Sequence, residues 1–101
     1  MASYTITETE AVSLTTEYRN NHEGKRRAFK IDKSEINQIF SDHPTAVGIR
    51  SYLGQENNSG PLRLIMVATD SNGNDILDVF YDHVKPCPSD CDTNSILNNG
   101  I

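Results

Sequence analysis

The chain has 101 residues, of which 36% are hydrophobic, and its net charge is −5. This length fits one domain with one core. Residues 1–69 carry eight acids and eight bases, whereas residues 70–101 carry six aspartates and one lysine. An acidic C-terminal third argues against nucleic acid as a partner, because phosphate contacts need a basic face.

The N-terminus lacks the features of a secretory signal, because residues 1–10 contain neither a basic segment nor an apolar one. The longest apolar run, residues 64–68, has five residues and is far too short to span a membrane. We therefore expect a soluble, acidic protein that is cytoplasmic by default. Export by a route without an N-terminal signal would leave no trace in the sequence.

The first expected element is a helix that begins after Thr7. Thr7 and Glu10 have the spacing of a capping box, in which each side chain binds a backbone N–H at the start of the helix. The helix should end near residues 20–22, before Gly24. Residues 25–31 are then expected to form a short strand.

The second expected helix begins after Asp32 and has the clearest start signal in the chain. Asp32 is a good N-cap residue, and Glu35 lies at the third helical position. Ile31 and Ile36 have the spacing of a hydrophobic staple. The helix should end before Pro44, which disfavours helical backbone in the preceding residue.

Three strands should follow, at residues 47–53, 62–69 and 76–80. The last two flank Asn72-Gly73, a strong hairpin signal, because a type I′ turn needs positive φ at both central residues. Residues 83–101 contain two prolines and no periodicity.

These elements predict an α+β fold with the order α-β-α-β-β-β. Two short helices should pack on one face of a mainly antiparallel sheet of three to four strands. We expect residues 1–82 to form the single domain and residues 83–101 to form an extended, irregular C-terminal tail.

The predicted turn also sets the register of the hairpin. It places Ala68 opposite Leu77 and Met66 opposite Val79, on a face that we assign to the core. The opposite face is also rich in apolar side chains, which suits contact with a partner protein or a second copy of the chain. This predicted interaction face consists of Ile65, Val67, Ile76 and Phe80. A shift of one residue in the register would exchange the two faces.

The tail contains both cysteines of the chain, in the sequence Cys87-Pro-Ser-Asp-Cys91. Three states are open: a disulfide, two free thiols, or a metal site in which His83 joins the two cysteines. Zinc is the metal that this ligand set would suit, but structural zinc sites need four ligands and only three are present here. No other cofactor is indicated.

Arg50 and Tyr52 should share one face of their strand, with Arg63 on the neighbouring strand. Together these side chains could form a small anion-binding surface. Ordinary cross-strand pairing explains the same residues without a ligand.

Several short motifs resemble a group of small, uncharacterised bacterial proteins of the Bacteroidota type. The motifs are Tyr18-Arg19, Gly48-Ile49-Arg50-x-Tyr52, Asp70-Ser-Asn-Gly-Asn-Asp75 and Cys87-Pro-Ser-Asp-Cys91. The tail in that group tends to read Cys-Pro-Pro-x-Cys, so Ser89 departs from its pattern. The resemblance implies no known activity and assigns no functional residue.

The sequence leaves three hypotheses for function. The first is a non-enzymatic module that binds another protein or assembles with itself, based on the predicted interaction face. The second is a small metal-binding or thiol/disulfide protein that uses Cys87 and Cys91. The third is a small enzyme, for which the sequence shows no catalytic residue.

Overall fold

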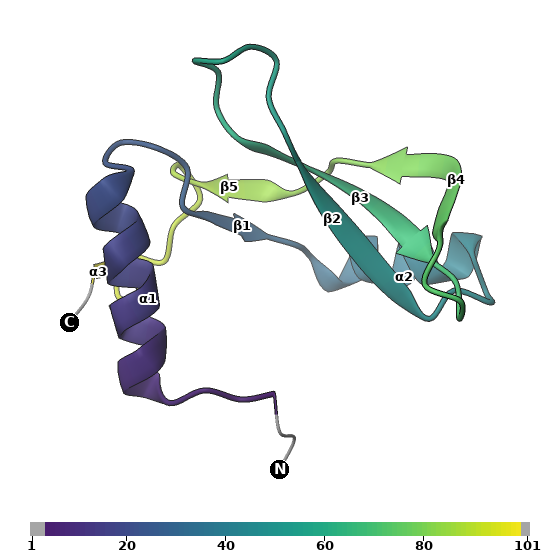
Figure 1. Cartoon of the computed structure of the whole chain (residues 1–101), viewed down its shortest axis with the longest axis horizontal. Coiled ribbons are helices and arrows are strands. Elements are labelled where there is room, and N and C mark those ends of the chain that lie inside the picture. Colours follow the sequence, from purple (N-terminus) through teal and green to yellow (C-terminus); the bar gives the residue numbers. More distant parts are fainter. Residues whose placement is uncertain (1–3, 100–101) are drawn as a thin grey trace. The chain divides into compact units, whose positions relative to one another are not determined.

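The computed structural model describes residues 4–99. It confirms the α+β class, and Figure 1 shows the elements in chain order. They are α1 (Glu8–Asn21), β1 (Ala28–Lys30), α2 (Lys33–Asp42), β2 (Gly48–Gly54), β3 (Arg63–Thr69), β4 (Asp75–Tyr81), β5 (Lys85–Cys87) and α3 (Ile96–Asn99).

The chain folds as two compact units. Unit 1 combines the N-terminal segment up to Ala28 with the C-terminal segment from Pro86, and unit 2 comprises Phe29–Lys85. This grouping differs from the expected domain of residues 1–82 followed by a tail. The first helix belongs with the C-terminal segment, and that segment contains α3 and part of β5.

Unit 1 contains α1 and α3. The predicted N-cap of α1 is present, because the Thr7 hydroxyl oxygen accepts the Glu10 backbone N–H at 3.1 Å. The Glu10 carboxylate accepts the Thr7 hydroxyl at 3.1 Å. Near the other end of α1, the Arg19 guanidinium donates to the Leu97 carbonyl at 2.9 Å. These bonds define where α1 starts and tie its last turn to α3.

Unit 2 contains α2 and a three-stranded sheet with the order β2-β3-β4. Helix α2 begins after Asp32, as predicted, but the Asp32 side chain makes no capping bond. Its carboxylate instead binds the Lys85 ammonium at 2.9 Å and lies 3.7 Å from the Lys30 ammonium. The hydrogen bond from Lys85 is the main reason that the pKa of Asp32 is lowered.

The core of unit 2 lies between α2 and β3. Ile39 from α2 packs with Met66 and Ala68 from β3, and all three are at most 1% exposed. Six partly buried residues surround this cluster: Ile31, Ala46, Ile49, Ile76, Tyr81 and Val84. The core is small, so each of its central side chains carries a large share of the apolar burial.

Strands β2 and β3 pair antiparallel along all seven residues, from Gly48 opposite Thr69 to Gly54 opposite Arg63. Gly48 is needed at its position because a Cβ atom there would lie 2.9 Å from the Thr69 hydroxyl oxygen. This close approach is one of the reasons for a glycine inside a strand.

The turn between β3 and β4 differs from the predicted type I′ turn. Gly73 has φ of +84°, but no non-glycine residue has positive φ in the part of the chain that the structure describes. The Asp70 carbonyl accepts the Gly73 N–H at 3.0 Å, and the Asp70 N–H donates to the Asn74 carbonyl at 2.9 Å. The loop is therefore one residue longer than a two-residue hairpin turn.

The longer loop overturns the predicted register of the hairpin. Ala68 lies opposite Ile76 instead of Leu77, and Thr69 lies opposite Asp75. A second shift follows, because the next pair is Met66 opposite Tyr81. Between these pairs β4 has more residues than β3, so residues 77–80 form a bulged segment. The bulge brings Ile76 and Tyr81 to the core, although Ile76 had been assigned to the other face.

Candidate functional site

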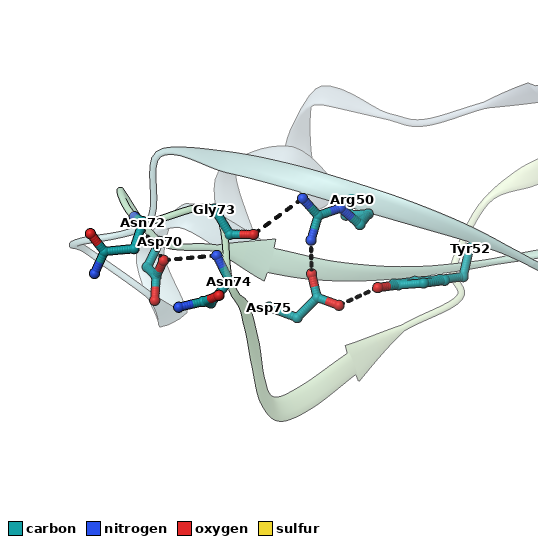
Figure 2. Close-up of polar contacts among 7 residues, drawn as sticks. All are labelled: Arg50, Tyr52, Asp70, Asn72, Gly73, Asn74 and Asp75. Atoms are coloured by element: carbon teal, nitrogen blue, oxygen red, sulfur yellow. Dashed lines mark hydrogen bonds and ion pairs between the residues drawn. The ribbon is translucent and has the colours of Figure 1, made fainter.

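A polar cluster spans the three-stranded sheet of unit 2. Arg50 and Tyr52, both on β2, point toward the Asp75 carboxylate at the start of β4, as Figure 2 shows. The Arg50 guanidinium and the Tyr52 hydroxyl each donate to one oxygen of that carboxylate. Arg50 also donates to the Gly73 carbonyl at 3.3 Å. The cluster therefore links the two end strands across β3.

The loop before β4 fixes the position of Asp75. One oxygen of the Asp70 side chain accepts the backbone N–H groups of Asn72 at 2.9 Å and Asn74 at 3.0 Å (Figure 2). An aspartate whose side chain accepts the backbone N–H groups of the residues that follow it stabilises a tight turn. The aspartate and glycine of the sequence motif thus set the loop that presents Asp75 to β2.

The cluster lies on the sheet face opposite the core, the same face as Val67. Val67 lies opposite Arg50 in the β2–β3 register and is 1% exposed. The hydrogen bond from Tyr52 is the main reason that the pKa of Asp75 is lowered, and Arg50 lowers it further. The same hydrogen bond raises the pKa of Tyr52. Asp75 is thus held as a carboxylate that both partners need.

Arg63 lies outside this cluster and has acidic partners of its own. It donates to the Glu56 carboxylate at 3.0 Å and to the Asp82 carboxylate at 2.6 Å. Each arginine of the predicted anion surface is therefore paired with an aspartate of the chain. An external anion would have to compete with Asp75 for Arg50 and with Asp82 for Arg63, so this structure gives the anion surface no support.

The four residues of the predicted interaction face do not form one exposed surface. Val67 is buried, Ile65 and Ile76 are half-buried, and Phe80 is 61% exposed. The predicted face assumed regular pairing along β4, whereas the bulge separates Ile76 from Phe80. Of this set, Phe80 alone presents most of its side chain to solvent.

Other exposed apolar side chains lie on the two end strands of the sheet. Leu53 on β2 is 72% exposed, and Leu77 on β4 is 64% exposed. Leu77 is expected on the core face, opposite Ala68, by strict alternation. Leu77 is exposed because it lies in the bulge, which no local pattern in the sequence indicates. Leu53 lies opposite Leu64 near the end of β2, beyond the core cluster.

In unit 1, the structure joins Cys87 and Cys91 by a disulfide. Cys87 is 5% exposed, and its carbonyl accepts the Arg27 backbone N–H at 2.7 Å. The Arg27 guanidinium also donates to the Asn98 side chain at 2.9 Å. The disulfide therefore lies beside the contacts that hold the C-terminal segment of unit 1 in place.

The disulfide leaves no cysteine thiolate for the predicted metal site. His83, its third proposed ligand, is hydrogen-bonded to the Glu35 carboxylate at 2.8 Å. Within residues 4–99, no group of three or more His, Cys, Asp or Glu side chains is arranged to hold a metal ion. The structure thus gives the zinc hypothesis no support.

Unit 1 also has a shallow depression of about 320 Å³ near the end of α1. Arg19, Arg27 and Asn98 contribute to its lining. Both arginines already donate to groups of the C-terminal segment, to the Leu97 carbonyl and to the Asn98 side chain. These bonds give the arginines a structural role in unit 1.

A buried histidine, His43, is the C-cap residue of helix α2. His43 is 7% exposed, its Nδ1 lies 3.2 Å from the Ile39 carbonyl oxygen, and its Nε2 lies 2.7 Å from an Asp78 carboxylate oxygen. Both ring nitrogens face acceptors, and only the doubly protonated ring can donate to both. The hydrogen bond to Asp78 is the main reason that the pKa of His43 is raised. Positive charge at a helix C-terminus is favourable as well.

We expect this pair to make stability fall as pH rises past neutrality. The pKa of His43 lies above its ordinary value of 6.5 in the folded chain, so its contribution is complete below that value. The contribution is lost as pH rises through the folded pKa. Urea unfolding between about pH 6 and about pH 9 should show this decline in the wild type and a weaker one in Asp78→Asn. An NMR titration that gives His43 a pKa at or below 6.5 would contradict the pairing.

No helix among residues 4–99 has the length and apolar character needed to cross a membrane. The chain matches no protein-family model, and no curated protein or solved structure was found to be similar to it. The resemblance to Bacteroidota proteins stays a prediction.

Proposed function

We propose that this chain is a non-enzymatic protein-binding module that uses the end strands of the sheet in unit 2. The observation that carries this proposal is the exposure of large apolar side chains on both strands. Leu53, Leu77 and Phe80 are each more than 60% exposed. Single exposed apolar residues are common, but several on the two end strands of one small sheet favour contact with another chain.

The arrangement of polar groups supports the same function. The Arg50, Tyr52 and Asp75 side chains satisfy one another, and the His43 ring has acceptors at both nitrogens. A general base needs a free nitrogen or carboxylate within reach of a substrate proton. These groups therefore suit a role in holding the sheet and α2 in place while the exposed side chains make contacts.

Photo-crosslinking tests the proposal. A photo-reactive amino acid at position 53 or 80 should give covalent adducts with protein in cells that express the chain. The same amino acid at Leu14, which is 63% exposed on α1 in unit 1, should give none. Circular dichroism would verify that each variant is folded. Absence of adducts at both 53 and 80 would contradict the proposed function.

A further inference from the structure

Strand β2 is an unprotected sheet edge within unit 2. One of its edges pairs with β3 along all seven residues without a shift, and among the described residues no strand pairs with its other edge. Natural proteins protect such edges with lysine, proline, bulges or inward-pointing charges. The strand, Gly-Ile-Arg-Ser-Tyr-Leu-Gly, has no lysine, no proline and no bulge.

Strand β4, at the other end of the sheet, shows the contrast. It has a bulge over residues 77–80, and Asp78 lies within it. A bulge interrupts the regular ladder of backbone hydrogen bonds and so hinders the addition of a further strand. The two edges of the same sheet are therefore unequal, and β2 is the edge that is open to pairing.

The sequence of β2 is nearly symmetric about Ser51. Glycine lies three positions to either side, at Gly48 and Gly54, and a branched apolar residue lies two positions to either side, at Ile49 and Leu53. The positions next to Ser51 are Arg50 and Tyr52, an arginine and an aromatic residue. A strand of this kind can pair antiparallel with a second copy of itself. Each residue on one side of Ser51 then faces the residue at the same distance on the other side of Ser51 in the second copy.

Two-fold symmetry restricts the possible registers. In an antiparallel pair, residues opposite each other point to the same face, and faces alternate along the strand. A two-fold axis through the sheet therefore has to pass at a residue paired with its own copy. With the axis at Ser51, all seven residues pair. With the axis at Arg50, fewer residues pair and two arginines lie directly opposite, which is unfavourable.

The register centred on Ser51 is also complementary in chemistry. On the core face, Leu53 of one copy lies opposite Ile49 of the other. Ile49 packs on the core cluster and Leu53 is 72% exposed, so the pairing extends the apolar core across the axis. On the other face, Arg50 of one copy lies opposite Tyr52 of the other. That tyrosine is bonded to Asp75, so the positive charge of Arg50 comes to lie beside a second acidic partner.

From this edge and its self-complementary register, we infer that the partner of β2 is a second copy of the chain. Two β2 strands pair antiparallel about an axis at Ser51, and the two sheets join into one of six strands. This inference rests on the proposed protein-binding function and names its partner. One seven-residue strand from each copy makes a contact smaller than a standard interface, so the dimer is weak and concentration-dependent.

Charge substitution at Ser51 tests the inference, because Ser51 is exposed and would face its own copy at the axis. Sedimentation velocity should show the wild type and Ser51→Thr shifting from monomer to dimer between about 10 μM and about 1 mM, the range of a weak interface. Ser51→Lys and Ser51→Glu should each stay monomeric, since like charges then lie opposite. An equimolar mixture of these two variants should recover the dimer as a heterodimer.

Two results would overturn the inference. One is a wild type that is monomeric throughout this range, even if position 53 gives crosslinks to a different protein, an outcome that leaves the proposed function intact. The other is a dimer that persists in both charged variants, because the contact then lies away from Ser51. Circular dichroism of Ser51→Lys and Ser51→Glu would verify that both variants fold, and the recovered heterodimer would show independently that their β2 strands are intact.

Discussion

Ile39→Ala should lower the free energy of unfolding of unit 2 by about 2–5 kcal/mol. Ile39 is fully buried and packs against Met66 and Ala68 at the centre of the core. Truncation removes apolar contacts and leaves a cavity, and the small surrounding cluster has few side chains that could fill it. Since small domains are stable by only about 5–15 kcal/mol, this one change is expected to unfold a large share of the molecules under mild denaturing conditions.

Val47→Ala is the matched control for this experiment. Val47 precedes β2 in the same unit and is 65% exposed, so its truncation should change stability by less than about 0.5 kcal/mol. Amide exchange of β3 residues, measured by NMR, reports on unit 2 alone. A loss of less than about 1 kcal/mol for Ile39→Ala would mean that α2 does not form the core with β3.

Reduction of the disulfide should destabilise unit 1 and leave unit 2 unchanged. The bond between Cys87 and Cys91 closes a loop of five residues, for which the chain-entropy model gives about 2 kcal/mol. Amides of α3 should therefore exchange faster by about 30-fold in a reducing agent, the equivalent of that free energy. Amides of β3 serve as the internal control, because they belong to the other unit.

The same experiment tests whether the disulfide has the structural role assigned to it. An unchanged exchange rate in α3 would show that the loop contributes nothing to unit 1, and the thiol or disulfide function would then become the better explanation of the two cysteines. Disulfides persist mainly in oxidising environments, so the state of the pair in cells also bears on the compartment of the protein.

Helices α1 and α2 could be predicted well from sequence because their signals are local, whereas α3 lies in the segment that was expected to be irregular. Thr7 and Glu10 mark the start of α1, and Asp32 and Pro44 bracket α2, all within a few residues of the observed ends. The structural role of the Asp32 side chain was less predictable. Its carboxylate binds Lys85, a residue far along the chain, and no local pattern could indicate that partner.

The register of the hairpin between β3 and β4 was predicted wrongly. Asn72-Gly73 did mark the turn. The Asp70 carboxylate, however, accepts two backbone N–H groups in the turn, and the loop is one residue longer than expected. A single residue was enough to exchange the faces of β4 at Ile76. After the bulge, Tyr81 packs on the core cluster and donates to the Asp42 carboxylate of α2 at 2.6 Å. These are long-range effects.

The candidate site was predictable in part. The pairing of Arg50 and Tyr52 on one face of β2 was expected, whereas Asp75 as their shared partner was not. Leu77 is predicted on the core face but is 64% exposed, because alternation alone cannot show where a strand bulges. The near-symmetry of the β2 sequence is visible without a structure. It indicates possible self-pairing only once β2 is known to be an edge strand of the sheet.

Amide exchange along β2 at low and high protein concentration tests the central claim most directly. If β2 pairs with a second copy, exchange of its outer-edge amides should slow as concentration rises, while exchange in the bulge of β4 stays constant. Exchange in β2 that does not depend on concentration, up to about 1 mM, would contradict a sheet completed by a second copy of the chain.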